Sequence, residues 1–192
     1  MCRALHIRNF EAAAPVSCDL YIDVNPAKYS EVRTMENEFQ FLLGRLAING
    51  LSRSTIVLKL LETVPVSDKF LLWFKDFVRE QHIRLALDGF GRGESNLERY
   101  HLVMPDVVKI DNRLFAQSMN YARKKRLLVS FISRIHDDGG KVVIEGLETE
   151  EMLVYARELC ADLFQGSFLD SPDLPMVDFF QLSRPNLSHA AH

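Results

Sequence analysis

The chain has 192 residues, of which 47% are hydrophobic and 26% are charged, and its formal net charge is −3. This composition suits one fairly large globular domain, residues 1–192, and gives no reason to expect nucleic acid or an anionic membrane surface as a partner. No apolar stretch is long enough to span a bilayer, and three scattered cysteines form no disulfide framework. We therefore expect a cytoplasmic protein.

The first half of the chain alternates short β-branched runs with amphipathic stretches. A strand is predicted over residues 20–25, followed by a helix over 30–49 whose apolar residues recur at spacings of three and four. A second strand over 55–61 leads to a helix that directs five residues inward: Phe70, Leu71, Phe74, Phe77 and Val78. A third strand over 83–87 is followed by a glycine-rich loop at 89–93 and a short helix near 96–102.

The second half continues the same alternation. A fourth strand over 107–111 precedes a longer helical region, with Leu127, Leu128, Phe131, Ile132 and Ile135 on one side. A fifth strand over 142–144 precedes a helix that Thr149 is expected to cap. A sixth, short strand covers 163–164, and a final short helix covers 177–182. Strands separated by helices predict an α/β fold with parallel pairing and right-handed crossovers.

Each predicted strand has a polar residue at or near its carboxyl end. These residues are Asn25, Glu62, Asp88, Lys109, Glu145 and Gln165. One such residue is ordinary, because strands reach the surface there. Six of them indicate a common site, because sites of parallel α/β folds form at the carboxyl ends of the strands. Carboxylate and amide oxygens suit magnesium or manganese, and a lysine can stabilise phosphoryl oxygens or orient a water.

Four further motifs lie at or just after the predicted strands: Leu-Ala-Leu-Asp-Gly-Phe-Gly-Arg-Gly at 85–93, Pro-Asp-Val-Val-Lys-Ile-Asp at 105–111, Val-Val-Ile-Glu-Gly-Leu-Glu-Thr-Glu at 142–150 and Gln-Gly at 165–166. Together these motifs resemble the EAL domain family, bacterial signal-transduction phosphodiesterases of cyclic di-GMP and their relatives. Upstream, residues 24–25 and 60–63 stand where the family places an asparagine and a glutamate. The resemblance is strongest over residues 20–175, and the combination of motifs is far more specific than any one of them.

The resemblance implies a modified TIM-type (β/α) barrel in which two magnesium or manganese ions activate a water to open cyclic di-GMP to linear pGpG. Carried over to this sequence, it makes Asn25, Glu62, Asp88 and Glu145 metal ligands. Lys109, with Glu145, takes the catalytic role, holding the attacking water or a phosphate oxygen. The residues that would line the substrate site are Asp111, Glu148 and Gln165.

The sequence also departs from the family pattern. The name-giving Glu-Ala-Leu strand, with its glutamate ligand and a nearby phosphate-binding arginine, has no match in the residues before Asn25, so about six of the usual strands are expected. Active members carry two consecutive aspartates where this chain has Asp88-Gly89, so Gly89 marks a lost ligand position. Two metal-ligand positions are therefore missing.

These departures favour a catalytically defective family member that binds cyclic di-GMP or a protein partner. An active, metal-dependent phosphodiesterase is the competing hypothesis, because Asn25, Glu62, Asp88, Lys109 and Glu145 are all present. The site would use magnesium or manganese, or no metal. An open barrel exposes strand edges, so we expect the gap to be covered by a homodimer contact, a protein partner or residues 1–18. Another hypothesis is that the chain is a fragment of a larger protein.

Overall fold

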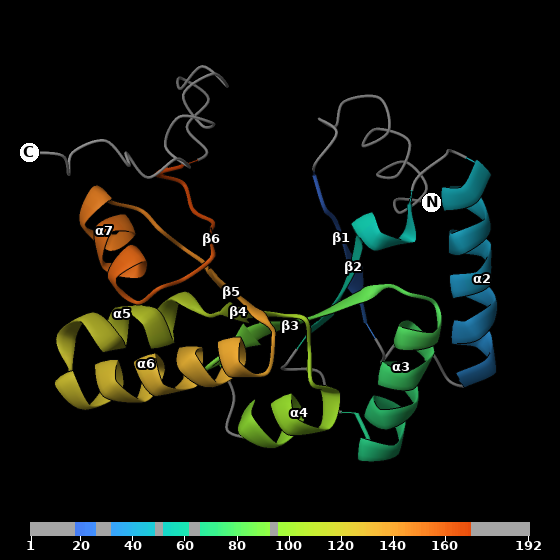
Figure 1. Cartoon of the computed structure of the whole chain (residues 1–192), viewed down its shortest axis with the longest axis horizontal. Coiled ribbons are helices and arrows are strands. Elements are labelled where there is room, and N and C mark those ends of the chain that lie inside the picture. Colours follow the sequence, from blue (N-terminus) through green and yellow to red (C-terminus); the bar gives the residue numbers. More distant parts are fainter. Residues whose placement is uncertain (1–17, 26–31, 49–51, 62–65, 93–95, 170–192) are drawn as a thin grey trace, which may run out of the picture.

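The computed structural model describes residues 18–25, 32–48, 52–61, 66–92 and 96–169. Its centre is a sheet of six parallel strands that follow one another in chain order (Figure 1). The strands are β1 (Leu20–Val24), β2 (Ile56–Leu61), β3 (Arg84–Phe90), β4 (Val107–Ile110), β5 (Lys141–Ile144) and β6 (Leu163–Phe164). Because all six run the same way, their carboxyl ends lie along one edge of the sheet.

Helices connect the strands and cover one face of the sheet. They are α2 (Val32–Ile48), α3 (Asp68–Glu80), α4 (Asn96–Val103), α5 (Asn112–Asn120), α6 (Ala122–Asp137) and α7 (Glu150–Glu158), with a short 3-10 turn, η2 (Arg53–Thr55). Ser67, Asp111 and Thr149 cap α3, α5 and α7 by accepting backbone N–H bonds, as the sequence predicted for Thr149. None of the helices in the described ranges is long and apolar enough to cross a bilayer.

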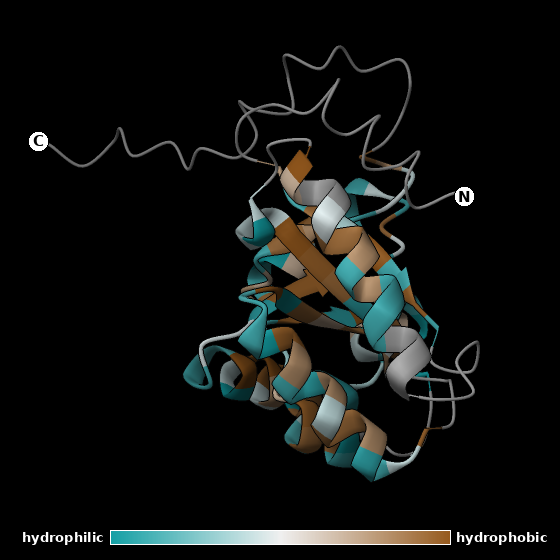
Figure 2. Ribbon diagram, turned by 90° about the vertical axis from the view of Figure 1, so that its right-hand side faces the viewer, coloured by the Kyte–Doolittle hydropathy of each residue, from teal (hydrophilic) through white to brown (hydrophobic). Residues whose placement is uncertain are grey.

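The main core lies between the sheet and the helices. One cluster packs α2 and α3 on β1–β3, and a second packs α5, α6 and α7 on β3–β5 (Figures 1 and 2). The opposite, inner face of the sheet carries a thin apolar layer of Val57, Ala86, Val107 and Val143, with Tyr21 beside it. Side chains alternate along each strand, so the residues two positions further along these strands also point to the inner face.

The structure confirms the predicted order of strands and helices and corrects several details. The helical region after β4 is two helices, α5 and α6, joined at Tyr121. Leu127 was expected on the inner side of this region but is 58% exposed, because α6 buries Leu128, Ile132 and Ile135 instead. Strand β3 extends through Gly89 to Phe90, with a register shift after Asp88. The helix predicted at 177–182 and the cover expected from residues 1–18 lie outside the described residues, apart from Cys18.

Candidate functional site

Five charged side chains form a row across the inner face of the sheet near the carboxyl ends of β1–β5. This charged row consists of Asp23, Lys59, Asp88, Lys109 and Glu145, so acids and bases alternate from strand to strand. Each member comes from a different strand or strand end. The row is therefore built by the parallel register of the sheet, in which Asp23 is opposite Lys59 and Asp88 is opposite Lys109.

Asp88 is the centre of the charged row. Its Oδ2 lies 3.0 Å from Lys59 Nζ and its Oδ1 lies 3.8 Å from Lys109 Nζ, so each carboxylate oxygen faces a different ammonium. Lys59 Nζ also lies 2.9 Å from Asp23 Oδ1, and Lys109 Nζ pairs directly with Glu145 Oε1. The side chains of Asp88 and Lys109 are 12% and 7% exposed, which places the middle of the row largely out of water.

The ammonium of Lys59 stays protonated in this setting. Partial burial by itself would lower the pKa of Lys59, but hydrogen bonds to Asp23 and Asp88 and the charges of both carboxylates outweigh it and raise the pKa above its usual value. Lys59 therefore holds a fixed positive charge between two carboxylates at any physiological pH.

Gly89 follows Asp88 with a left-handed backbone (φ 79°) at the point where the β3–β4 register shifts. The guanidinium of Arg92 lies 3.9 Å from the place that a Cβ at position 89 would take, which is an ordinary van der Waals distance. Arg92 Nε and Nη2 lie 2.8 and 2.7 Å from Asp111 Oδ2, while half of the arginine side chain remains exposed. A cation therefore lies next to Gly89, the position where the resemblance leads us to expect a second carboxylate.

The remaining residues predicted for the site are spread more widely. Asp111 is buried and uses its side chain to hold Arg92 and to accept from the N–H of Arg113 at the start of α5. Asn25 is half-buried just after β1. The side chains of Glu148 and Gln165 are exposed, and Glu62 lies outside the described residues. The structure thus brings Asp88, Lys109 and Glu145 together. The ligand-binding roles of the other predicted residues stay predictions.

Asp23 and Lys59 were missed by the sequence reasoning, which considered only residues at the strand ends. A signal was present, because Lys59 is the only charged residue in the otherwise apolar run Ile56–Leu61. Charged side chains are rare in such buried runs unless they are paired with an opposite charge. The partners themselves, Asp23 and Asp88, are distant in the sequence and follow only from the register of the sheet.

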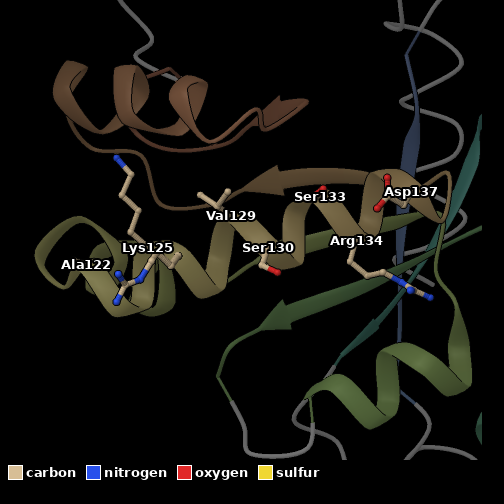
Figure 3. A pocket seen from close by; sticks show the side chains of 8 residues that line it. Ala122, Lys125, Val129, Ser130, Ser133, Arg134 and Asp137 are labelled. Atoms are coloured by element: carbon tan, nitrogen blue, oxygen red, sulfur yellow. The ribbon is translucent and has the colours of Figure 1, made fainter.

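A separate hollow of about 760 Å³ lies along α6 on the helical side of the molecule (Figure 3). Its lining residues all come from α6: Ala122, Lys125, Arg126, Val129, Ser130, Ser133, Arg134 and Asp137. Lys125 reaches across to α7, where its Nζ lies 3.8 Å from Glu158 Oε2 and 4.9 Å from the centre of the Tyr155 ring. None of the predicted site residues that the structure describes lines this hollow, so we place the candidate site at the charged row.

Comparison with known proteins identifies the family. The sequence model of the EAL domain family matches residues 3–172 of this chain. The chain belongs to the EAL domain family. The probable cyclic di-GMP phosphodiesterase PdeI of Escherichia coli K12 is 30% identical over 156 residues, which is 79% of this chain and 19% of PdeI. The cyclic di-GMP phosphodiesterase NbdA of Pseudomonas aeruginosa is 28% identical over 116 residues, 60% of this chain and 14% of NbdA. The chain thus spans about a fifth or less of the length of these two relatives.

Solved structures confirm the predicted EAL-type fold. The EAL domain of Mycobacterium smegmatis DcpA superposes with a TM-score of 0.74 at 23% identity, covering 94% of this chain and 79% of that domain. Bacillus subtilis YkuI, solved with cyclic di-GMP and calcium, gives a TM-score of 0.74 at 23% identity over 86% of this chain and 40% of YkuI. Klebsiella pneumoniae BlrP1, solved with manganese and cyclic di-GMP, gives a TM-score of 0.71 at 26% identity, covering 86% of this chain and 41% of the BlrP1 chain.

The metals in these neighbouring structures raise the question of whether the charged row fits a divalent cation. Such a cation needs several oxygen ligands that converge on one point. Here both oxygens of Asp88 face ammonium groups, and Glu145 is paired with Lys109. Within the ranges that the structure describes, no group of three or more His, Cys, Asp or Glu side chains is placed to hold a metal. The charged row therefore does not fit a divalent cation in this arrangement.

Proposed function

We propose that the chain binds cyclic di-GMP at the carboxyl edge of its sheet and hydrolyses it poorly or not at all. Family membership and the cyclic di-GMP in the neighbouring YkuI and BlrP1 structures support the choice of ligand. The lost carboxylate at Gly89 supports the catalytic defect, because magnesium- or manganese-dependent hydrolysis depends on carboxylates that hold the ions next to the reacting phosphate.

The observation that carries the proposal is the position of Arg92. Its guanidinium lies beside Gly89, is held by the buried Asp111 through two N–H groups, and remains half exposed. The exposed N–H groups can donate to a phosphodiester oxygen, and a guanidinium fixed in one orientation loses little entropy when it does so. Arg92 would thus serve as a phosphate-binding arginine at this edge of the sheet.

The other site residues would assist binding rather than cleavage. Lys109 places a second positive charge at the floor of the site, although its pairing with Asp88 and Glu145 reduces the charge available to a ligand. Asp111 acts through Arg92 by fixing its orientation. Asn25, Glu148 and Gln165 lie at or just beyond strand ends, where their side chains could contact the guanine bases and the ribose groups.

Isothermal titration of cyclic di-GMP into wild-type protein and the Arg92→Gln variant tests the proposal. We expect micromolar binding by the wild type and about tenfold weaker binding by Arg92→Gln, which corresponds to one lost charged hydrogen bond. Arg134→Gln is the matched control. Like Arg92, Arg134 pairs with an aspartate through its Nε, at 2.8 Å from Asp138, and it is 57% exposed, but it lies on α6 rather than at the charged row. Equal affinities for wild type and Arg92→Gln would remove Arg92 from the site.

Hydrolysis remains a second candidate because Asp88, Lys109 and Glu145 are brought together and the relatives PdeI and NbdA are named as phosphodiesterases. Prolonged incubation with cyclic di-GMP and manganese, followed by chromatography of pGpG, decides between the two. Product that disappears in Lys109→Ala would establish the enzyme and overturn the binding-only proposal. If the chain neither binds nor cleaves the nucleotide, a protein partner is the remaining role for the domain.

A further inference from the structure

We propose that Lys59 is a built-in cation, which takes the place of a divalent metal between Asp23 and Asp88 and makes the charged row independent of metal. The inference starts from the inner face of β2, where Val57, Lys59 and Leu61 alternate with the outward-facing residues of the core. Lys59 is the side chain of this strand that reaches the charged row.

The position of the Lys59 ammonium is the position that a bridging metal would need. Lys59 Nζ lies 2.9 Å from Asp23 Oδ1 on β1 and 3.0 Å from Asp88 Oδ2 on β3, so it links carboxylates from the strands on either side of its own. A metal ion between these two carboxylates would have to occupy the same volume. Lys59 is covalently part of β2 and is only 19% exposed, so moving its ammonium away would take from the largely buried Asp88 the nearer of its two lysine partners.

Charge explains what Lys59 does for the site. The charged row contains three carboxylates, and without the two lysines an anionic ligand at this edge would be repelled. An ammonium group neutralises a carboxylate, as a metal ion does, and it also donates up to three hydrogen bonds. An ammonium does not, however, lower the pKa of a bound water as a metal does. Replacing a metal by Lys59 therefore preserves anion binding and removes metal-assisted water activation.

Manganese binding without any nucleotide tests the inference. Titration of Mn²⁺ into metal-free protein, followed by electron paramagnetic resonance of the free ion, should show no saturable site below 1 millimolar for the wild type. Lys59→Glu places a third carboxylate between Asp23 and Asp88 and should create one saturable site, at least tenfold tighter than any wild-type binding. Lys75→Glu is the matched control, since Lys75 is also 19% exposed and paired with Asp76 but lies on α3 away from the row.

Two results would overturn the inference. One is a stoichiometric, sub-millimolar manganese site in the wild type. The other is folded Lys59→Glu protein, verified by circular dichroism, that gains no site beyond that of Lys75→Glu. If Lys59→Glu does not fold, Lys59→Gln is used in its place. Mn²⁺ should then raise the unfolding temperature of Lys59→Gln and leave that of the wild type unchanged. Equal changes in the two unfolding temperatures would contradict the role of Lys59.

A second consequence rests on the proposed function. Cyclic di-GMP should bind the wild type with the same affinity, within twofold, in EDTA and in manganese. Affinity that falls more than tenfold in EDTA would show that a metal is needed and would refute the built-in cation. Absence of nucleotide binding in both conditions would instead refute the proposed function, while the manganese titration would still decide the role of Lys59.

Discussion

Asp88→Asn is the substitution with the largest expected effect on stability in the charged row. The asparagine keeps the shape of the side chain but removes the charge that Lys59 and Lys109 share at 3.0 and 3.8 Å. Breaking a buried ion pair by removing one partner typically costs about 3–5 kcal/mol. Each lysine keeps a second carboxylate, Asp23 or Glu145, so we expect the lower end, about 3 kcal/mol of unfolding free energy.

Equilibrium unfolding in urea, monitored by far-ultraviolet circular dichroism, measures this change. The matched control is Asp76→Asn, which breaks the pair between Lys75 and the exposed Asp76 at 3.7 Å and should change the free energy by less than about 1 kcal/mol. In a thermal scan the Asp88→Asn variant should melt roughly 6–12 °C lower than the wild type. A loss no larger than that of Asp76→Asn would refute the conclusion that the middle of the charged row is a buried, mutually paired network.

Three further predictions concern the frame around the site. Gly166→Ala should lower the unfolding free energy by about 2 kcal/mol, because a Cβ there would overlap the backbone of Leu147. Gly44→Ala should raise the unfolding free energy by about 0.5–1 kcal/mol, because Gly44 lies inside α2 with open space around it. Urea unfolding of the two glycine variants should therefore show changes in unfolding free energy of opposite sign. Tyr100→Phe removes the 2.7 Å hydrogen bond to Asp138 and should destabilise the protein at neutral pH. That hydrogen bond, together with the ion pair to Arg134, lowers the pKa of Asp138. The stabilisation by the bond is therefore present above the ordinary pKa of 3.8 and is lost as the pH falls through the lowered pKa. Urea unfolding of wild type and Tyr100→Phe should show a smaller difference in unfolding free energy at pH 2.5 than at pH 7.

Local patterns in the sequence were sufficient to predict the six strands and most of the helices. β-branched runs gave the strands, spacings of three and four gave the helical faces, and Thr149 gave a helix start. The prediction was wrong for Leu127, because α6 carries apolar residues on more than one face and only packing against the sheet decides which face is buried. Tyr121 likewise separates α5 from α6 without glycine or proline to mark the break.

The sequence by itself determined the family of this protein and the kinds of residue that reach the carboxyl edge of its sheet, because motifs and alternation are local properties of the chain. Only the tertiary structure decided which charges meet. The pairing of Lys59 with Asp23 and Asp88, and the position of Arg92 beside Gly89, depend on strand register and on the register shift in β3. An ion pair is set by distances of about 3 Å between residues far apart in the sequence, and no local pattern fixes those distances.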